Sequence, residues 1–415
     1  MIDGIKPQRS GASRERAKIS RENANDEPAF VPPEDVVDMQ GTSEKPGFFD
    51  KAAPVATKHR KSPVVWFKGL TKKQKIIAII VLVLALAALG GGAYALLKKP
   101  AAPPPAPVVE VKKEEPVKVE PIYSPLTGIV VSKEQSQLPV IGVMIENSPE
   151  ARPQSGLNQA GVVFEAIAEG GITRFLTLFQ EAQPDYIGPV RSVRPYYVDW
   201  LQGFDAAVAH VGGSAEALAK IRNEGVKDLD QFANSGPYRR VSNRYAPHNM
   251  YSNVASLTDL AKGKGWTTSS FTGFPRKAEK PSDAPTARTV DITISGALYN
   301  VRYDYDLASN SYKRSLAGKP HLDERSKEQI SPKVVVAIVV PFGISSNGVN
   351  SVYQTIGSGK AFIFQDGLAT EGTWEKSTSK SQIVFKDAAG VQIPFNAGQT
   401  WITATSIANN VLYKP

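Results

Sequence analysis

The sequence predicts an α/β domain followed by a mainly β domain, both preceded by one transmembrane helix and a disordered tail. Three observations lead to this prediction. Residues 76–97 form an uncharged apolar run of 22 residues. Between residues 122 and 270, strand-like runs alternate with helical segments, whereas residues 289–415 hold short strand-like runs divided by Asn, Gly and Asp turns. The first pattern is typical of layered α/β domains and the second of mainly β folds.

Residues 1–57 are polar, rich in Arg, Glu, Asn and Pro, and have no sustained apolar periodicity. This composition predicts a disordered tail. Residues 58–75 carry seven Lys or Arg and no acid, so the positive-inside rule predicts that the tail is cytoplasmic. We interpret the formal net charge of +9 as partly an attraction to anionic lipid of the inner leaflet, and we expect no nucleic-acid partner.

The apolar run 76–97 is predicted to cross the membrane once, because 22 helical residues extend roughly 33 Å and a hydrocarbon core is about 30 Å thick. The run follows 75 polar residues, which favours a retained anchor over a cleaved signal peptide. Residues 98–121 are rich in Pro, Lys and Glu and predict an extended stalk. The remaining chain is then expected to be extracytoplasmic, in the cell envelope.

The α/β domain is predicted over residues 122–270. Its expected strands are 139–146, 161–168, 172–179 and 206–211, and its expected helices are 195–201, 214–223 and 253–262. A proline-rich segment, 271–288, is predicted to be a linker. In the β-rich domain, 289–415, strands are expected at 291–294, 299–305, 312–316, 334–340, 361–365, 383–386 and 399–404.

Three arginines of the first domain, Arg174, Arg191 and Arg194, lie among apolar runs, where an unpaired cation is costly. Two interpretations stay open. Glu165 and Glu169 lie just upstream and could pair with the arginines internally, or the guanidinium groups could bind an external carboxylate or phosphate. The two interpretations are compatible, since glutamates can hold arginines that also contact a ligand.

A second possible anion site is the turn Val211-Gly-Gly-Ser-Ala-Glu216. Here a strand is expected to end in Gly212 and Gly213, and a helix to begin with Ser214 as its N-cap. Free backbone N–H groups and the positive end of the helix would then point at one spot. An ordinary strand-to-helix turn explains the same residues.

Four residues are candidates for general acid or base catalysis: Glu165, Glu169, His210 and His248. A structural role explains each histidine as well, so no residue is assigned a catalytic role and the existence of a reaction stays open. The chain has no cysteine, which excludes disulfides, thiolate ligands and a lipid-modified cysteine. No two histidines have metal-ligand spacing, so neither a metal nor another cofactor is expected.

Several motifs of the two domains are distinctive in combination: Ala151-Arg-Pro-Gln-Ser-Gly-Leu157, Glu169-Gly-Gly-Ile-Thr-Arg-Phe175, Gly188-Pro-Val-Arg-Ser-Val-Arg-Pro195, His210-Val-Gly-Gly-Ser214, Ala246-Pro-His-Asn249, Gly359-Lys-Ala-Phe-Ile-Phe-Gln-Asp-Gly367 and Gly398-Gln-Thr-Trp-Ile402. Through them the chain resembles the bacterial YerB-like lipoproteins, a family of unknown function. The resemblance covers residues 122–415 and implies distinct N-terminal and C-terminal domains outside the membrane. Typical members look like lipoproteins tethered through a cysteine, whereas this chain has the apolar run 76–97.

We therefore expect a single-pass membrane protein of the bacterial cell envelope that binds an anionic envelope ligand. The candidate ligand-binding residues are Arg152, Arg174, Arg191, Arg194, Gly212, Gly213, Ser214 and Asn249. Two alternatives remain: a transferase or hydrolase that acts on a lipid-linked or cell-wall substrate in the same pocket, and a scaffold that binds an envelope protein partner. Arginines that are open and convergent would favour a ligand or a substrate, and arginines neutralised by glutamates would favour the scaffold.

Overall fold

The computed structural model describes residues 67–97 and 120–415, apart from residue 347. The predicted tail 1–57, half of the basic segment 58–75 and nearly all of the predicted stalk 98–121 lie outside the described residues. The chain divides into two compact units, Met1–Val111 and Lys112–Pro415. Each unit is described by itself below.

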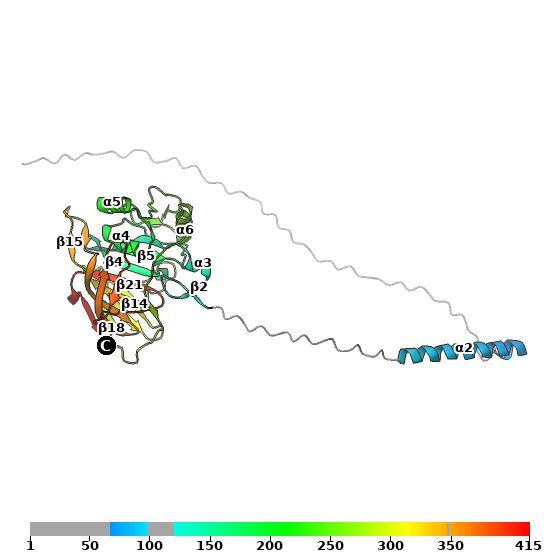
Figure 1. The fold of residues 1–415 in the computed structure, drawn as a ribbon. Helices are drawn as coiled ribbons and strands as arrows, with labels where there is room; N and C mark the ends of the chain where they lie inside the picture. The colour runs from blue at the N-terminus through cyan, green and yellow to red at the C-terminus, as the bar shows by residue number, and fades with distance from the viewer. Residues whose placement is uncertain (1–66, 98–119, 347) are drawn as a thin grey trace, which may run out of the picture. The chain divides into compact units, whose positions relative to one another are not determined.

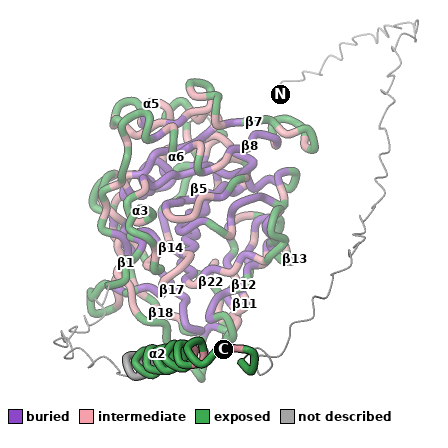
Figure 2. The backbone as a smooth tube through the Cα atoms, turned by 90° about the vertical axis from the view of Figure 1, so that its right-hand side faces the viewer, coloured by how far each residue is buried: buried purple, intermediate pink, exposed green. Residues whose placement is uncertain are grey.

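The first unit contains helix α2 (Lys72–Leu97), which includes the predicted span. Its segment Lys72–Gly92 is long and apolar enough to cross a membrane by length and composition. No acidic residue lies in its first turn and no basic residue in its last turn. Most of the helix residues whose burial is described are exposed, and Figure 2 shows α2 in green.

The centre of the second unit is a nine-stranded sheet with the strand order β19-β18-β17-β14-β21-β4-β5-β3-β6 (Figure 1). The strands in that order are Val384–Lys386, Leu368–Lys376, Gly357–Gln365, Val334–Val339, Thr400–Thr405, Val162–Glu169, Ile172–Phe179, Ile141–Glu146 and Ala207–Ala209. The last four belong to the predicted α/β domain and the first five to the predicted β-rich domain. They join where β21 pairs in parallel with β4, with Thr400 opposite Val162. One continuous sheet therefore runs through both predicted domains.

Both faces of this sheet are covered. Successive residues of β4 point to opposite faces, so Val162 and Phe164 belong to one hydrophobic core and Val163 belongs to the other. The helices α4 (Pro195–Gln202) and α5 (Ala215–Glu224) contribute to the first core. Helix α6 (Val254–Gly263) and a five-stranded sheet contribute to the second. Burial on both faces explains why β3 and β5 consist mostly of apolar residues, and Figure 2 shows β5 as largely buried.

The five-stranded sheet has the order β13-β12-β11-β10-β22. Its strands are Lys319–Pro320, Ser311–Leu316, Val301–Asp306, Thr289–Ile292 and Val411–Lys414, and the remaining short strands of the unit are β1 (Ile122–Tyr123), β2 (Val130–Val131), β7 (Arg239–Arg240), β8 (Met250–Tyr251), β9 (Arg276–Lys277), β15 (Phe342–Ile344), β16 (Ser351–Tyr353) and β20 (Phe395–Asn396). Helix α3 (Lys133–Ser136) is a single capped turn. The C-terminal half is thus mainly β, as predicted.

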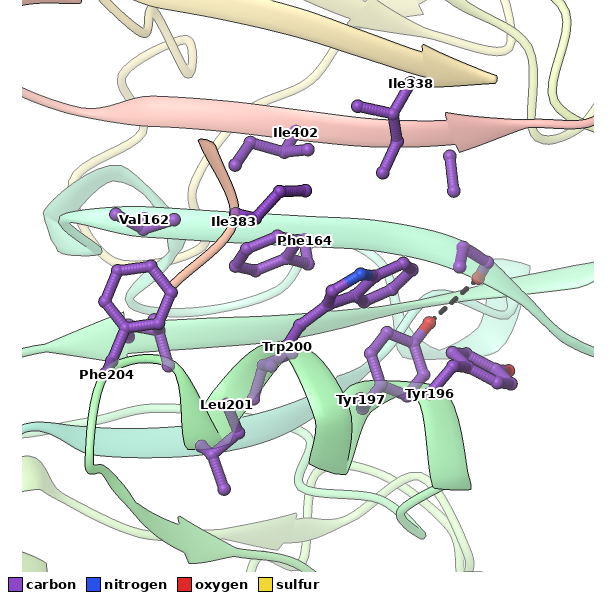
Figure 3. Close-up of a cluster of buried hydrophobic side chains, with 14 of the residues drawn as sticks. Val162, Phe164, Tyr196, Tyr197, Trp200, Leu201, Phe204, Ile338, Ile383 and Ile402 are labelled. Carbon is purple, nitrogen blue, oxygen red and sulfur yellow. Dashed lines mark hydrogen bonds between the residues drawn. The ribbon is translucent and has the colours of Figure 1, made fainter. Parts of the chain in front are cut away.

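Helix α4 brings an aromatic face onto the sheet (Figure 3). Pro195 occupies the first turn, a position that tolerates its missing N–H. Trp200 stacks on Phe164 of β4 with ring centroids 5.2 Å apart. The buried Tyr197 hydroxyl donates to the carbonyl oxygens of Ala166 and Arg174 at 2.9 and 2.7 Å. These contacts hold α4 against β4 and β5, the strand that carries Arg174.

The segment 271–288, predicted to be a linker, is packed against both halves of the unit. Phe274 is buried in the first core. Strand β9 pairs in parallel with β20, and the Arg276 guanidinium donates to the Asn396 carbonyl at 2.9 Å. The predicted linker therefore contributes to a hydrophobic core and to strand pairing within this unit.

Candidate functional site

Two of the predicted arginines share one carboxylate. Nη2 of Arg174 and Nη2 of Arg194 lie 2.6 Å from the two carboxylate oxygens of Glu169. Burial alone would raise the pKa of Glu169, but the two guanidinium groups outweigh it and hold the pKa below its ordinary value. Both arginine side chains are buried. Of the two open interpretations, the internal network describes this pair, which keeps one net positive charge.

Arg191 has a different partner, Glu146 at the end of β3, which the sequence analysis did not single out. Its Nε lies 3.2 Å from Glu146 Oε1, while Nδ1 of His248 lies 3.0 Å from Oε2. A histidine with Nδ1–H directed at a carboxylate keeps Nε2 as a base. The His248 side chain is 22% exposed, so this pair has the geometry and access needed for acid–base chemistry.

Asn249, next to His248, has a supporting role. Its Oδ1 accepts from Arg240 Nη1 at 2.7 Å and its Nδ2 donates to the Val241 carbonyl at 3.2 Å. These bonds fix the turn that presents His248. They also use both ends of the amide within the protein.

His210 is fully buried at the end of β6. Nε2 lies 3.0 Å from Asp228 Oδ1 and Nδ1 lies 2.8 Å from the carbonyl oxygen of Gly212. Both partners are acceptors, so the ring satisfies them together only when both nitrogens carry hydrogen. Burial would raise the pKa of Asp228, but the hydrogen bond from His210 leads to a net lowering. This histidine joins two loops and is not accessible to a substrate.

The turn formed by Gly212, Gly213 and Ser214 is a capped strand-to-helix turn. Ser214 is the N-cap of α5, as predicted, and its hydroxyl accepts from the Ala217 N–H at 3.2 Å. The N–H of Gly212 points at Asp230 Oδ1 at 3.4 Å. An acid of the protein itself thus faces the position where the sequence suggested an external anion.

Glu165 is completely buried and pairs with an arginine that sequence reasoning missed. Its Oε2 accepts from Arg314 Nη2 of β12 at 2.7 Å, and neither side chain is exposed. The Trp401 indole N–H donates to the same oxygen at 3.1 Å, and the Arg314 guanidinium lies 4.5 Å from the Trp401 ring centroid. The available signal was position: Arg314 lies between Tyr312 and Leu316 on the inward face of an alternating strand.

From Arg314 a chain of polar groups leads toward the surface. The Arg314 guanidinium donates to His321 Nδ1, and His321 Nε2 donates to Gln154 Oε1 at 2.9 Å. Gln154 Nε2 donates to Asn147 Oδ1 at 2.9 Å. Burial, followed by the charge of Arg314, lowers the pKa of His321 well below its ordinary value. The ring is therefore a neutral link between the two predicted domains.

Arg152 is the surface end of this chain. Its Nε and Nη2 donate to the side-chain and backbone oxygens of Asn147 at 3.0 and 2.9 Å, and its guanidinium carbon lies 5.1 Å from the Tyr299 ring centroid. Burial lowers the pKa of Arg152, although an arginine remains charged at any physiological pH. Among the described residues no carboxylate lies within 4 Å of this guanidinium.

Arg152 lines a cavity of about 550 Å³ between the two predicted domains. The cavity is formed by Pro149, Arg152, Pro153, Leu298, Leu316, Ala317, Lys319, Pro320, His321 and Leu322. Its size is within the range of roughly 300 to 1,000 Å³ that is usual for small-molecule sites. Of the four predicted ligand-binding arginines, Arg152 is the one that lines this cavity.

Comparison with known proteins also finds an N-terminal and a C-terminal domain in this chain. Residues 126–267 match the N-terminal domain, and residues 290–402 the C-terminal domain, of a protein family of unknown function, DUF3048. The protein described as "Putative lipoprotein YerB" from Bacillus subtilis is 30% identical over 295 residues, which cover 70% of this chain and 88% of that protein. The crystal structure of YerB from Bacillus subtilis matches with a TM-score of 0.64 at 28% identity, over 71% of this chain and 100% of that one. The chain therefore belongs to the DUF3048 family and is homologous to YerB.

Proposed function

We propose that this protein is a cell-envelope protein, held in the membrane by α2, whose C-terminal unit lies outside the cell and binds an anionic ligand at Arg152. One observation carries the ligand proposal: Arg152 lines a cavity and has no carboxylate partner within 4 Å among the described residues. The other cationic groups of the predicted site each face an acid of the protein.

Membrane attachment is supported by the relative and by the sequence. YerB carries the description "Putative lipoprotein", whereas this chain has no cysteine for a lipid. Helix α2 would supply the attachment in another chemical form. The seven basic residues in 58–75 favour a cytoplasmic N-terminus and a single crossing.

The orientation can be tested by cysteine labelling, because the natural chain contains no cysteine. We expect a membrane-impermeant maleimide to label Ser242→Cys, at an exposed position of the second unit, in intact cells. Ser10→Cys, in the basic N-terminal region, should react only after permeabilisation. The opposite labelling pattern would reverse the proposed orientation.

The chemical reason for choosing Arg152 is its partner. A carboxylate cancels the charge of a guanidinium, whereas the amide and carbonyl oxygens of Asn147 orient it without cancelling its charge. Nη1 of Arg152 has no hydrogen-bond partner in the described part of the chain, so its two N–H groups remain for a ligand. Lys319 adds a second cation to the cavity wall.

The ligand site can be tested by thermal unfolding of the full chain in nanodiscs, with and without inorganic pyrophosphate. We expect the anion to raise the midpoint of the parent, since a ligand at 100 times its Kd adds about 2.7 kcal/mol of stability. Arg152→Ala should unfold within about 1 to 2 kcal/mol of the parent, because it leaves no buried acid unpaired, and should not respond to pyrophosphate. Arg302→Ala removes an exposed guanidinium outside the cavity and should respond as the parent does.

Two results would contradict the proposal: a parent that shows no anion-dependent shift, or an Arg152→Ala variant that shifts as much as the parent. The first would favour the scaffold alternative, in which the C-terminal unit binds an envelope protein. Release of phosphate during the incubation, abolished in His248→Gln, would favour the hydrolase or transferase alternative.

A further inference from the structure

We infer that the ligand of the Arg152 cavity is an amphiphile, with an anionic head held at Arg152 and a single hydrocarbon chain laid along the leucines of the opposite wall. This inference rests on the proposed function, because it assigns a chemical class to the ligand of the same site. It follows from the composition of the cavity wall, its rigidity and the exposure of its rim.

The wall combines two kinds of surface. Its cations are Arg152 and Lys319, and no acid is among the ten lining residues. Nearly all other lining residues are apolar: three prolines, three leucines and an alanine. A small inorganic anion would pair with the cations but would leave the apolar wall in contact with water. No free energy would then be gained from burying the apolar surface.

Two of the three leucines that line the cavity are exposed. Leu298 is 54% exposed and Leu322 is 38% exposed, whereas Leu316 is buried. Single exposed leucines are common, but a group of them around a cavity that also contains a buried leucine marks a surface that gains free energy when an apolar group covers it. A hydrocarbon chain would cover all three.

The two walls are fixed relative to each other before any ligand binds. Asp323 Oδ2 accepts from the backbone N–H groups of Gly156 and Leu157 at 2.7 and 3.1 Å, and Ser155 donates to Glu324 at 2.6 Å. These bonds connect the loop that carries Arg152 to the turn that carries His321 and Leu322. A preformed cavity avoids much of the entropy that a closing one loses on binding.

The head group is an oxyanion that a guanidinium recognises, either a phosphate or a carboxylate. Alkyl phosphates and fatty acids carry these two head groups on the same kind of hydrocarbon chain. Comparing them at one chain length therefore separates the contribution of the head group from that of the chain. Each methylene that leaves water adds up to about fourfold in affinity, equivalent to about 0.8 kcal/mol. Chain length therefore reports directly on contact with the leucine wall.

The test is equilibrium dialysis of radiolabelled butyl, hexyl and decyl phosphate, below their micellar concentrations, against the full chain in nanodiscs. Binding to nanodiscs that carry Arg152→Ala is subtracted, so that partition into lipid cancels. We expect affinity to rise at least tenfold from butyl to decyl phosphate. In Leu298→Ser/Leu322→Ser, whose substitutions are at exposed positions, we expect the rise from butyl to decyl phosphate to be lost. Decanoate in place of decyl phosphate shows which head is preferred.

The outcomes separate this inference from the proposed function. Arg152-dependent binding that is independent of chain length would overturn the amphiphile and leave the anion site intact. Decyl maltoside that binds as tightly as decyl phosphate would overturn the anion site. The absence of any Arg152-dependent binding would overturn both.

Discussion

Arg314 and Arg152 are the two ends of one polar chain, and they differ in what neutralises them. Arg314 lies in the core with no exposure, against an equally buried Glu165 at 2.7 Å. Arg152 lies at the wall of a cavity and is held by the amide and carbonyl of Asn147. A buried cation without an anion is too costly to persist, whereas a partly solvated one can keep its charge available. The partner, rather than the arginine itself, therefore distinguishes the structural position of Arg314 from the position that we propose binds a ligand.

The largest effect is expected at the core end. Arg314→Ala leaves the Glu165 carboxylate buried without its cation, which should lower the free energy of unfolding by about 3 to 5 kcal/mol. Urea unfolding followed by tryptophan fluorescence measures this loss. A double variant, Glu165→Gln/Arg314→Met, should be more stable than the single variant because it removes both charges. A loss below about 1 kcal/mol in Arg314→Ala would contradict a structural role for the pair, and Glu165→Gln provides the measurement if Arg314→Ala does not fold.

A smaller, pH-dependent effect is expected at His321, the middle of the chain. Its folded pKa lies below the ordinary value of 6.5, so between these two pH values the unfolded chain binds a proton that the folded chain does not. Stability should therefore fall as the pH drops below about 6.5, by up to about 1.4 kcal/mol per pH unit. His321→Gln keeps one donor and one acceptor and should show a shallower slope than the parent. Equal slopes in parent and variant would show that the histidine is not held neutral by the fold.

The local elements of the fold were predictable because they depend on neighbours in sequence. The run at 172–179 is strand β5 with the predicted bounds, and Ser214 and Asn253 cap the predicted helices. Strand β18 (Leu368–Lys376) was missed because few of its residues are buried and it contains a central Gly-Thr in place of apolar alternation. The continuous sheet was not predictable, since the pairing of β21 with β4 is a long-range contact that no local pattern records.

The candidate site was predictable as a set of residue types but not as a set of pairs. Charged residues in apolar runs marked Glu165, Arg174 and Arg194 correctly as positions that need partners. The partner of Glu165, however, lies 149 residues away in the other half, and the acid that pairs with Arg191 is on a strand outside the arginine-rich stretch. Sequence spacing favoured Glu165 and Glu169 as partners of all the arginines because they were the nearest acids. Only the tertiary fold separates Arg152 from the other candidate arginines, because it shows that Asn147 rather than an acid holds this guanidinium.

The placement of β21 between β14 and β4 has a consequence for how the protein is made. Trp401 of β21 follows Glu165, to which it donates a hydrogen bond, by 236 residues. Until those residues have been synthesised, β4 pairs only with β5 and is an edge strand with apolar side chains on both faces, a form that is prone to association with other chains. Neither the N-terminal nor the C-terminal domain of the family can complete the nine-stranded sheet alone. Pairing between strands that are far apart in sequence is also slow. A truncation that removes β21 would therefore also affect the N-terminal half, because it would leave β4 at an open edge of the sheet.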